Sequence, residues 1–367
     1  MKGEKTPRIE IDLQKIAHNA KRLTNHFREK GIGITGVVKG VCASPEVARI
    51  FVESGMTTIA DTKIANLRKL KKEGFKAELI LLRTPAISEA AHVVQYADIS
   101  MNTELDVIRA LSAAATSVNK KHRIILMVEM GDLREGILPD DLPSIIQQVL
   151  PLEGVQIVGI GANFACFGGV IPTEKKMNEF STLANRIQKE FSLAFKYISG
   201  GNSANYEWFT STPSPGAINH LRLGEAILLG RETVRRKPIP GLYTDAFRLI
   251  AEVIESKIKP SVPDGEIGSD AFGEIPSFID RGTIRRTIVG IGRQDVFVSG
   301  LTPRQPVEIL GASSDHIILD AKHMPLKPGD EVSFSLNYGA LLSAMTSPYV
   351  HKKYLPANIN EQYHDVG

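Results

Sequence analysis

Short apolar runs and longer amphipathic stretches alternate along the chain up to about residue 240. Stretches such as SPEVARIFVESG, TKIANLRKLKKEG and TEKKMNEFSTLANRIQKEF predict helices. Eight strand and helix units over about 230 residues suit a (β/α)8 barrel, which typically takes about 250 residues. A doubly wound open sheet is the alternative architecture. The predicted strands are GITGVVK, TTIAD, AELILLR, ADISM, RIILMVEM, QIVGIGAN, FKYISGG and NHLRLGE.

The pattern changes near Gly241, where the helical periodicity fades. The runs RLIAEVIESKIKP, RRTIVGIG, PVEILGA, HIILDA and DEVSFSLNYG alternate with Pro and Gly turns and predict a β-rich domain. We therefore expect an α/β chain with a TIM barrel over residues 8–235 and a smaller β-rich domain over residues 236–367. Residues 1–13, which contain RIEIDL, are a candidate strand of that second domain. The charged run at residues 231–237 is interpreted as a solvated linker.

Composition and charge exclude several classes of function. The chain has 367 residues, 43% of them hydrophobic, which is enough for a large core. It contains no apolar run long enough for a membrane span and no signal peptide, so we expect a cytoplasmic protein. Its 44 basic and 41 acidic residues are spread evenly, so no nucleic-acid surface is expected. Cys42 and Cys166 form neither a disulfide framework nor a zinc motif, and no metal is expected.

Lys39 ends the first predicted strand, in GITGVVKG. Chemistry in (β/α)8 barrels occurs at the carboxyl ends of the strands, so we expect its amine at the barrel mouth. A surface lysine whose amine reaches solvent is the ordinary alternative. A partly desolvated lysine can instead lose its proton and attack an aldehyde such as that of pyridoxal phosphate.

Two glycine-rich turns follow the seventh and eighth predicted strands. The first, SGGNSAN, places Asn202 and Ser203 at the start of a helix, and the second, LRLGEAILLG, places Gly224 at a strand end. Each turn alone is also a common helix cap. The loops after these two strands are, however, the usual phosphate-binding place of the fold, so together they favour a phosphorylated ligand.

These segments carry a resemblance to a known family. VVKG, GDLREGI, SGGNSAN and LRLGEAILLG resemble motifs of the alanine racemase family of barrel-type pyridoxal-phosphate enzymes, and most of all its ornithine and amino-acid racemase branch. The resemblance implies that Lys39 forms the internal aldimine and that Arg222 faces the pyridine nitrogen. It also implies that Arg134 and Asp315 bind substrate. The implied cofactor-binding residues are Lys39, Asn163, Asn202, Ser203, Arg222, Gly224 and Tyr338.

The second domain resembles the same family. VGIGRQDV, GASSDHIILD and LNYGALL resemble segments that reach into the active site of a partner subunit. The resemblance therefore implies a homodimer with shared active sites.

Three positions depart from the family pattern. Ala43 stands where a tyrosine helps to hold the phosphate, and Asn163 where a histidine stacks on the pyridine ring. Arg293 stands where a tyrosine serves as the second catalytic base, and an arginine stays protonated and is a poor base. A small buried filler is the ordinary interpretation of Cys166. The second base is left open among Tyr338, Cys166, Asp295 and Asp315.

The expected function is a pyridoxal-phosphate-dependent racemase acting on a basic amino acid such as ornithine. Glu129, Asp132 and Glu135 lie near the predicted mouth and are candidates to pair with a distal ammonium, or are solvated loop carboxylates. An alanine or broad-specificity racemase is the alternative enzyme. A non-catalytic pyridoxal-phosphate carrier would lack the second domain. Metal-dependent aldolases and dehydratases related to the family carry a His-x-Cys pair near the C-terminus, which this chain lacks. Related decarboxylases carry a catalytic motif with a cysteine, which is also not found in this chain.

Overall fold

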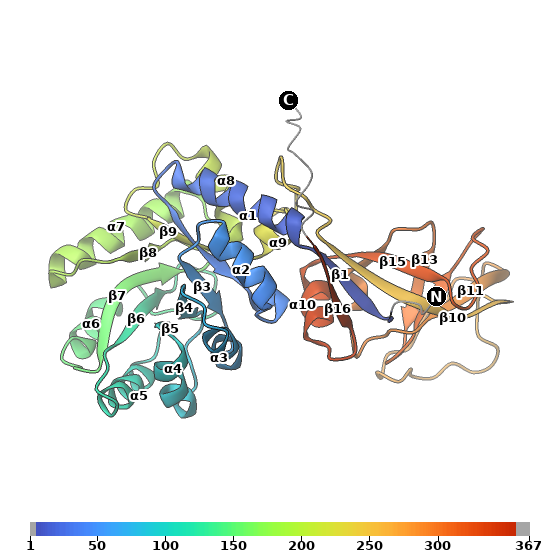
Figure 1. Ribbon diagram of the computed structural model, residues 1–367, viewed down its shortest axis with the longest axis horizontal. Helices are drawn as coiled ribbons and strands as arrows, with labels where there is room; N and C mark the ends of the chain where they lie inside the picture. Colours follow the sequence, from blue (N-terminus) through green and yellow to red (C-terminus); the bar gives the residue numbers. More distant parts are fainter. Residues whose placement is uncertain (1–4, 357–367) are drawn as a thin grey trace. The chain divides into compact units, whose positions relative to one another are not determined.

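The computed structural model describes residues 5–356, which form two compact units. One unit comprises Lys15–Thr244 and the other combines Met1–Gln14 with Asp245–Gly367, so the first unit extends beyond the expected boundary at residue 235. Figure 1 shows the helices and strands of each unit along the chain. No helix within the described residues is long and apolar enough to cross a membrane.

The first unit contains a closed barrel of eight parallel strands. Each predicted run overlaps one of these strands to within one residue, so the predicted (β/α)8 architecture is confirmed. In Figure 1 the barrel strands run in order from blue to yellow-green, and helices follow most of them. The strands are β2 (Gly33–Val37), β3 (Thr58–Asp61), β4 (Glu78–Leu81), β5 (Ile99–Asn102), β6 (His122–Val128), β7 (Val155–Ala162), β8 (Tyr197–Ser199) and β9 (His220–Leu223).

Local sequence explains where the helices begin. Ser44 accepts the amide hydrogen of Val47 and Pro45 occupies the first turn, which starts α2. Thr173 accepts the amide hydrogen of Lys176 in the same way at the start of α7. The helices are α1 (Leu13–Arg28), α2 (Pro45–Glu53), α3 (Ile64–Lys72), α4 (Ala90–Tyr96), α5 (Leu105–Thr116), α6 (Leu142–Val149), α7 (Glu174–Phe191), α8 (Tyr206–Ser211) and α9 (Glu225–Leu229), with short 3-10 turns η1 (Lys39–Val41), η2 (Ile87–Glu89) and η3 (Ser203–Asn205).

The interior of the barrel is mainly apolar and is closed at the amino-terminal end of the strands by a charged cluster. Glu78 accepts hydrogen bonds from Arg123 at 2.6 Å and from Tyr197 at 2.8 Å. Burial raises the pKa of Glu78, but hydrogen bonds from Arg123, Lys196 and Tyr197 outweigh it and lower the pKa to about 2. The apolar interior is formed by Val37, Ala60, Ile80, Ile99, Met101, Ile125, Met127, Val158 and Tyr197.

The second unit is built on an eight-stranded sheet in which β12, β15, β10, β11, β14 and β13 follow one another. The N-terminal strand pairs antiparallel with β10 and parallel with β16. Among the described residues after Asp245, the α-helix is α10 (Tyr338–Thr346). The strands are β1 (Arg8–Asp12), β10 (Phe247–Pro260), β11 (Thr283–Val289), β12 (Leu301–Pro303), β13 (Glu308–Ala312), β14 (Ile317–Asp320), β15 (Glu331–Leu336) and β16 (His351–Leu355), with a 3-10 turn η4 (Val298–Gly300).

The segment at residues 231–237 exposes Arg235, Arg236 and Lys237, as expected for a solvated run, but it lies within the barrel unit and is not a linker. Glu232 is buried, and its carboxylate accepts the amide hydrogens of Val234, Arg235 and Lys237. One buried carboxylate therefore organises a compact loop that belongs to the barrel unit. Two of the loop's arginines bind helices that follow the last barrel strands: Arg235 pairs with Glu207 of α8, and Arg236 pairs with Glu225 of α9.

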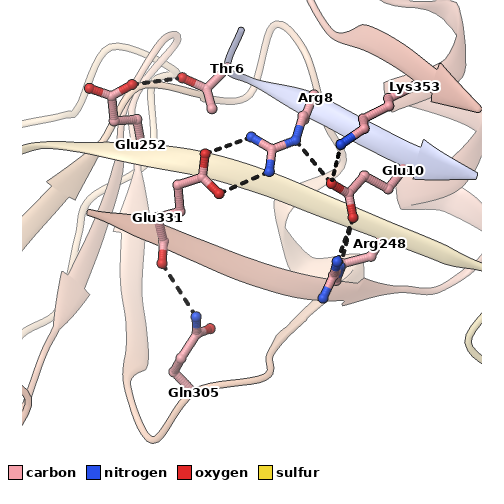
Figure 2. Close-up of polar contacts among 8 residues, drawn as sticks. All are labelled: Thr6, Arg8, Glu10, Arg248, Glu252, Gln305, Glu331 and Lys353. Carbon is pink, nitrogen blue, oxygen red and sulfur yellow. Dashed lines mark hydrogen bonds and ion pairs between the residues drawn. The ribbon is translucent and has the colours of Figure 1, made fainter. Parts of the chain in front are cut away.

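An ion network in the second unit joins four strands (Figure 2). Arg8 on β1 donates two parallel hydrogen bonds to Glu331 on β15, at 2.6 and 2.9 Å, and a third to Glu10 at 3.1 Å. Glu10 also accepts from Arg248 on β10 at 2.5 Å and lies 3.5 Å from the amine of Lys353 on β16. Burial raises the pKa of Glu10, but the hydrogen bonds outweigh it, and the pKa is lowered. The hydrogen bond from Arg8 lowers the pKa of Glu331.

We expect Arg8→Met to lower the free energy of unfolding at pH 7 by roughly 2 kcal/mol, because Glu10 and Glu331 lose a shared, buried donor. Both carboxyls have a folded-state pKa below the ordinary 4.5, so their contribution is present above pH 4.5 and is lost as the pH falls through the folded values. The cost of the substitution should therefore shrink at pH 4, as measured by urea unfolding.

Arg281→Met is the matched control, because Arg281 forms an exposed ion pair with Glu308 in the same unit. It should change the unfolding midpoint much less than Arg8→Met at pH 7. Equal costs for Arg8→Met at pH 7 and pH 4 would contradict a role for the ion network in stability.

Candidate active site

Lys39 follows β2 directly and begins the turn η1, at the carboxyl end of the barrel. Its side chain is half-buried. The charge of the Lys39 amine acts to lower the pKa of Asp61, which ends the neighbouring strand β3, and of Glu225, which follows the other neighbouring strand β9. The amine therefore lies near these two strand ends. Burial raises the pKa of Asp61, whose carboxylate accepts hydrogen bonds from the amide of Lys63 and the side chain of Asn66. The barrel thus brings Lys39 to the mouth, where the sequence predicted it.

The turn after β8 has a tightly specified conformation. Asn202 caps η3, since its Oδ1 accepts the amide hydrogen of Ala204 at 2.8 Å, and its Nδ2 donates to the carbonyl oxygen of Phe164 at 2.9 Å. Gly201 has φ +142°, and a Cβ at this position would lie 2.1 Å from Oδ1 of Asn205. Only glycine fits there, so this turn depends on the second glycine of SGGNSAN.

One hydrogen bond joins this turn to the turn after β9. The amide of Ala226 donates to Oγ of Ser203 at 3.1 Å, which leaves the hydroxyl hydrogen of Ser203 free to donate elsewhere. The amides of Ser203 and Glu225 are the first of η3 and α9 and have no acceptor within those helices. At Gly224 a Cβ would lie 3.1 Å from the carbonyl oxygen of Val37, so glycine lets β9 pass close to β2. The two turns therefore offer a group of donors suited to an anion.

Arg222 on β9 is buried, with 4% of its surface exposed. Its Nη1 donates to Oγ of Ser199 at 2.5 Å, and its Nη2 donates to the carbonyl oxygen of Ala162 at 2.8 Å and to Oδ1 of Asn163 at 2.6 Å. Within residues 5–356 the Nε–H of Arg222 has no acceptor. Burial, followed by the charge of Arg134, lowers the pKa of Arg222 to about 10, so the guanidinium stays charged at neutral pH.

The loops after β6 and β7 are held together by Asp132. This buried carboxylate accepts the amide hydrogens of Cys166, Phe167 and Val170. In the same loops, Nη1 of Arg134 lies 2.7 Å from Sγ of Cys166. Asp132 therefore positions Cys166 beside an arginine. Cys166 is exposed, so the expectation that it is a small buried filler is wrong.

The other two acidic residues predicted near the mouth differ in what they bind. Glu129 accepts the amide hydrogens of Gly131 and Leu133 and so shapes its own loop. Glu135 pairs with a side chain instead: its carboxylate accepts from Nη2 of Arg134 at 2.8 Å and lies 2.6 Å from Nε. Glu135 can thus release Arg134 and bind another cation without a change in the backbone.

The remaining predicted site residues belong to the second unit. Asp295 is buried and accepts the hydroxyl hydrogen of Ser347 at 2.8 Å. Asp315 is exposed, and its pKa is lowered by hydrogen bonds from its neighbours, the Ser314 hydroxyl first. Tyr338 begins α10. Arg293 lies with its guanidinium carbon 4.3 Å from the centre of the Phe272 ring and forms an ion pair with Glu274 at 3.4 Å.

Two polar residues inside the barrel, Ser199 and His220, were not predicted from the sequence. His220 lies two residues before Arg222 on the same strand, so the alternation of side chains along a strand places both on the same face. The spacing of two residues could therefore have indicated that His220 lies on the same face of the strand as Arg222. Ala43, where the family has a phosphate-binding tyrosine, is fully buried and has φ 47°.

A parallel (β/α)8 barrel with a lysine, a buried arginine and two donor-rich turns at its mouth has side chains and amides suited to an anionic ligand such as a phosphate. Residues 11–232 match the family model of the alanine racemase N-terminal domain. The chain is 42% identical over 353 residues to an ornithine racemase of Acetoanaerobium sticklandii, covering 95% of this chain and 99% of that protein. The chain belongs to the alanine racemase family.

Two further comparisons agree. The chain is 37% identical over 353 residues to a lysine racemase of Thermotoga maritima, covering 96% of this chain and 99% of that protein. The solved structure of an alanine racemase from Bartonella henselae with covalently bound pyridoxal phosphate matches with a TM-score of 0.71 at 18% identity, covering 96% of this chain and all of that one. This structural similarity supports the fold.

We expect Asp132→Asn to speed hydrogen exchange at the amides of Cys166, Phe167 and Val170 at least roughly tenfold, because these amides lose a charged acceptor. Exchange followed by mass spectrometry on peptides from this loop measures the effect. Asp140→Asn, an exposed residue of the preceding loop, is the control and should leave these amides unchanged. Unchanged exchange in Asp132→Asn would show that the carboxylate does not hold the loop.

Proposed function

We propose that this protein is a pyridoxal-phosphate-dependent racemase that interconverts the L- and D-enantiomers of a basic amino acid, with ornithine as the preferred substrate. The observation that carries the proposal is the buried, charged Arg222, which lies in the same barrel mouth as Lys39. The Nε–H of Arg222 has no acceptor among the described residues. The similarity to an ornithine racemase and a lysine racemase over almost the whole chain supports the substrate class.

The donor set fits this cofactor. The amine of Lys39 would bind its aldehyde carbon, and Nε of Arg222 would donate to its ring nitrogen. The hydroxyl of Ser203 and the amides of Ser203 and Glu225 would bind its phosphate, in turns shaped by Asn202 and Gly224. Asn163 would hold Arg222 in place. When bound, the cofactor acidifies the α-carbon of the amino acid by delocalising the electrons left behind.

Arg222 would also restrict the reaction that follows. A guanidinium with a pKa of about 10 donates a hydrogen bond but keeps its proton at neutral pH. A guanidinium beside the ring nitrogen disfavours protonation of that nitrogen, and this limits how far the ring withdraws electrons from the α-carbon. Limited withdrawal favours return of the proton to the α-carbon over transamination or elimination, which suits a racemase.

Lys39 would take up or return the α-proton on one face of the substrate, and racemisation needs a second group on the other face. Of the four candidates for that group, Cys166 lies on the barrel unit, whereas Tyr338, Asp295 and Asp315 lie on the second unit. Asp295 is already bound to Ser347.

Arg134 and Glu135 would bind the substrate. Arg134 offers a guanidinium suited to the carboxylate of an amino acid. Of the three acidic residues predicted near the mouth, Glu129, Asp132 and Glu135, only Glu135 is paired with a side chain and not with backbone amides, so we infer that it receives the distal ammonium of ornithine. Asp315 would contribute to the same site from the second domain of a neighbouring subunit.

We expect the purified protein to bind pyridoxal phosphate and to racemise ornithine faster than lysine, and lysine faster than alanine. Lys39→Ala should lower the rate with ornithine by more than roughly a hundredfold, because the acid–base group of one face is removed. Circular dichroism of each amino acid over time measures the rates, and visible absorption measures cofactor binding.

Lys63→Ala is the control, because Lys63 is an exposed lysine two residues after a neighbouring barrel strand. It should keep both cofactor and activity. A protein that takes up no pyridoxal phosphate would overturn the proposal as a whole, and a preference for alanine would overturn its substrate class.

We further propose that the protein forms a homodimer in which the second domain of one subunit completes the site of the other. The second unit exposes many large apolar side chains, which is typical of an association surface. They include Ile254, Ile258, Ile267, Phe272, Ile275, Phe278, Ile279 and Phe297.

Sedimentation equilibrium should therefore give about twice the mass of one chain at micromolar concentration. Because each site would need the neighbouring subunit, the specific activity should fall on dilution in parallel with the dimer. A diluted monomer that keeps its full specific activity would contradict a shared site.

A further inference from the structure

A chain of hydrogen bonds runs through the otherwise apolar interior of the barrel and ends at Arg222. His220 on β9 is 4% exposed. Its Nδ1 lies 2.8 Å from Oγ of Ser199, and its Nε2 lies 2.7 Å from Oγ1 of Thr35. Thr35 contacts the hydroxyl of Thr58 on β3 at 2.5 Å. The imidazole packs edge-on against the ring of Tyr197, with the ring centres 5.0 Å apart.

The proton positions in this chain follow from Arg222. A guanidinium only donates, so Oγ of Ser199 accepts from Nη1 of Arg222. The hydroxyl hydrogen of Ser199 then needs an acceptor, and the remaining partner of that hydroxyl among residues 5–356 is Nδ1 of His220. If Nδ1 carried a hydrogen, the buried Ser199 hydroxyl would have no acceptor, which is costly inside a barrel. Nδ1 therefore accepts, and Nε2 carries the hydrogen and donates to Thr35.

These donor and acceptor roles also require that His220 is neutral. Burial, followed by the charge of Arg222, lowers the pKa of His220 to about 3. A protonated imidazole would have two donors and would turn Nδ1–H towards Ser199. The neutral ring instead keeps the Ser199 lone pairs directed at Arg222.

We propose that neutral His220 is a positioning residue, which fixes the Ser199 hydroxyl and through it the guanidinium of Arg222, so that Nε–H points at the cofactor ring. This inference rests on the proposed function for the identity of the ligand. The chain of contacts stands on the barrel alone. Thr35 serves as the acceptor that selects the tautomer of His220, and Thr58 holds Thr35 in turn.

The first test is the dissociation constant of pyridoxal phosphate from the apo-protein, for three substitutions. His220→Leu removes the acceptor for Ser199 and should weaken binding roughly tenfold, the loss expected for one disordered hydrogen bond to a charged group. His220→Asn places a neutral acceptor near the position of Nδ1 and should restore binding to within about threefold of wild type.

His122→Leu is the matched control. His122 is also 4% exposed, lies on barrel strand β6, and contacts a serine, with Nε2 2.9 Å from Oγ of Ser100. Its pKa is likewise lowered by burial, to about 4. It belongs to no chain that reaches Arg222 within the described contacts, so its loss should leave cofactor affinity unchanged.

A second test needs no cofactor. In apo-protein labelled with 15N-histidine, the signal that disappears in His220→Asn should report a neutral ring with its hydrogen on Nε2 throughout pH 5 to 8. Thr35→Val removes the acceptor of that hydrogen and should shift the Nε2 signal, whereas the His122 signal should stay in place.

The outcomes separate the two proposals. Failure of the wild-type protein to bind pyridoxal phosphate would overturn the proposed function, while the NMR result would still decide the tautomer. An Nδ1–H tautomer, or a ring protonated at pH 6, would overturn the role of His220. Equal weakening of cofactor binding in His220→Leu and His122→Leu, or no rescue by His220→Asn, would overturn it as well.

Discussion

Arg222 carries a positive charge that is buried in the mouth of the barrel, and the surrounding strands are arranged to make that burial possible. An unpaired charge in the interior is costly unless its donors are satisfied. Three neutral oxygens accept from Nη1 and Nη2 of Arg222: the carbonyl of Ala162, the amide oxygen of Asn163 and the hydroxyl of Ser199. Since the donors of a guanidinium have a fixed planar arrangement, these contacts restrict how the ends of β7, β8 and β9 lie relative to one another.

The close spacing of backbone in the same region depends on glycine. Gly201 adopts a φ that favours glycine and has no room for a Cβ, and Gly224 lets β9 pass the end of β2, from which Lys39 follows. The hydrogen bond between Ser203 and Ala226 then joins the two turns. Lys39, Arg222 and the donor turns are therefore attached to the ends of adjacent strands of a closed barrel, which would keep the proposed cofactor site organised before any ligand is bound.

The strands and the mouth could be predicted because their signals are local. Runs of β-branched residues marked all eight strands, and Lys39, Ser203 and Arg222 could be placed from their positions at strand ends. Other features depend on contacts between distant segments. Glu232 organises residues 231–237 by accepting their amides, and Asp132 joins the loops after β6 and β7 in the same way; in the sequence both are single acidic residues in polar segments. The exposure of Cys166 follows from that loop arrangement and not from its apolar neighbours.

The partners of Arg222 also explain why the barrel tolerates histidine in its interior. A carboxylate at position 199 would satisfy the guanidinium more strongly, but it would compensate the charge that the proposed function requires beside the cofactor ring. The Ser199 hydroxyl accepts from Arg222, and the neutral imidazole is placed to accept from Ser199 in turn, so the positive charge stays in place. Burial is the main reason that the imidazole stays neutral, and the positive charge of Arg222 adds to it, because two buried cations would repel each other. Under the proposed role of His220, the two residues depend on each other: the arginine selects the tautomer of the histidine through Ser199 and helps to keep it neutral, and the histidine orients the arginine.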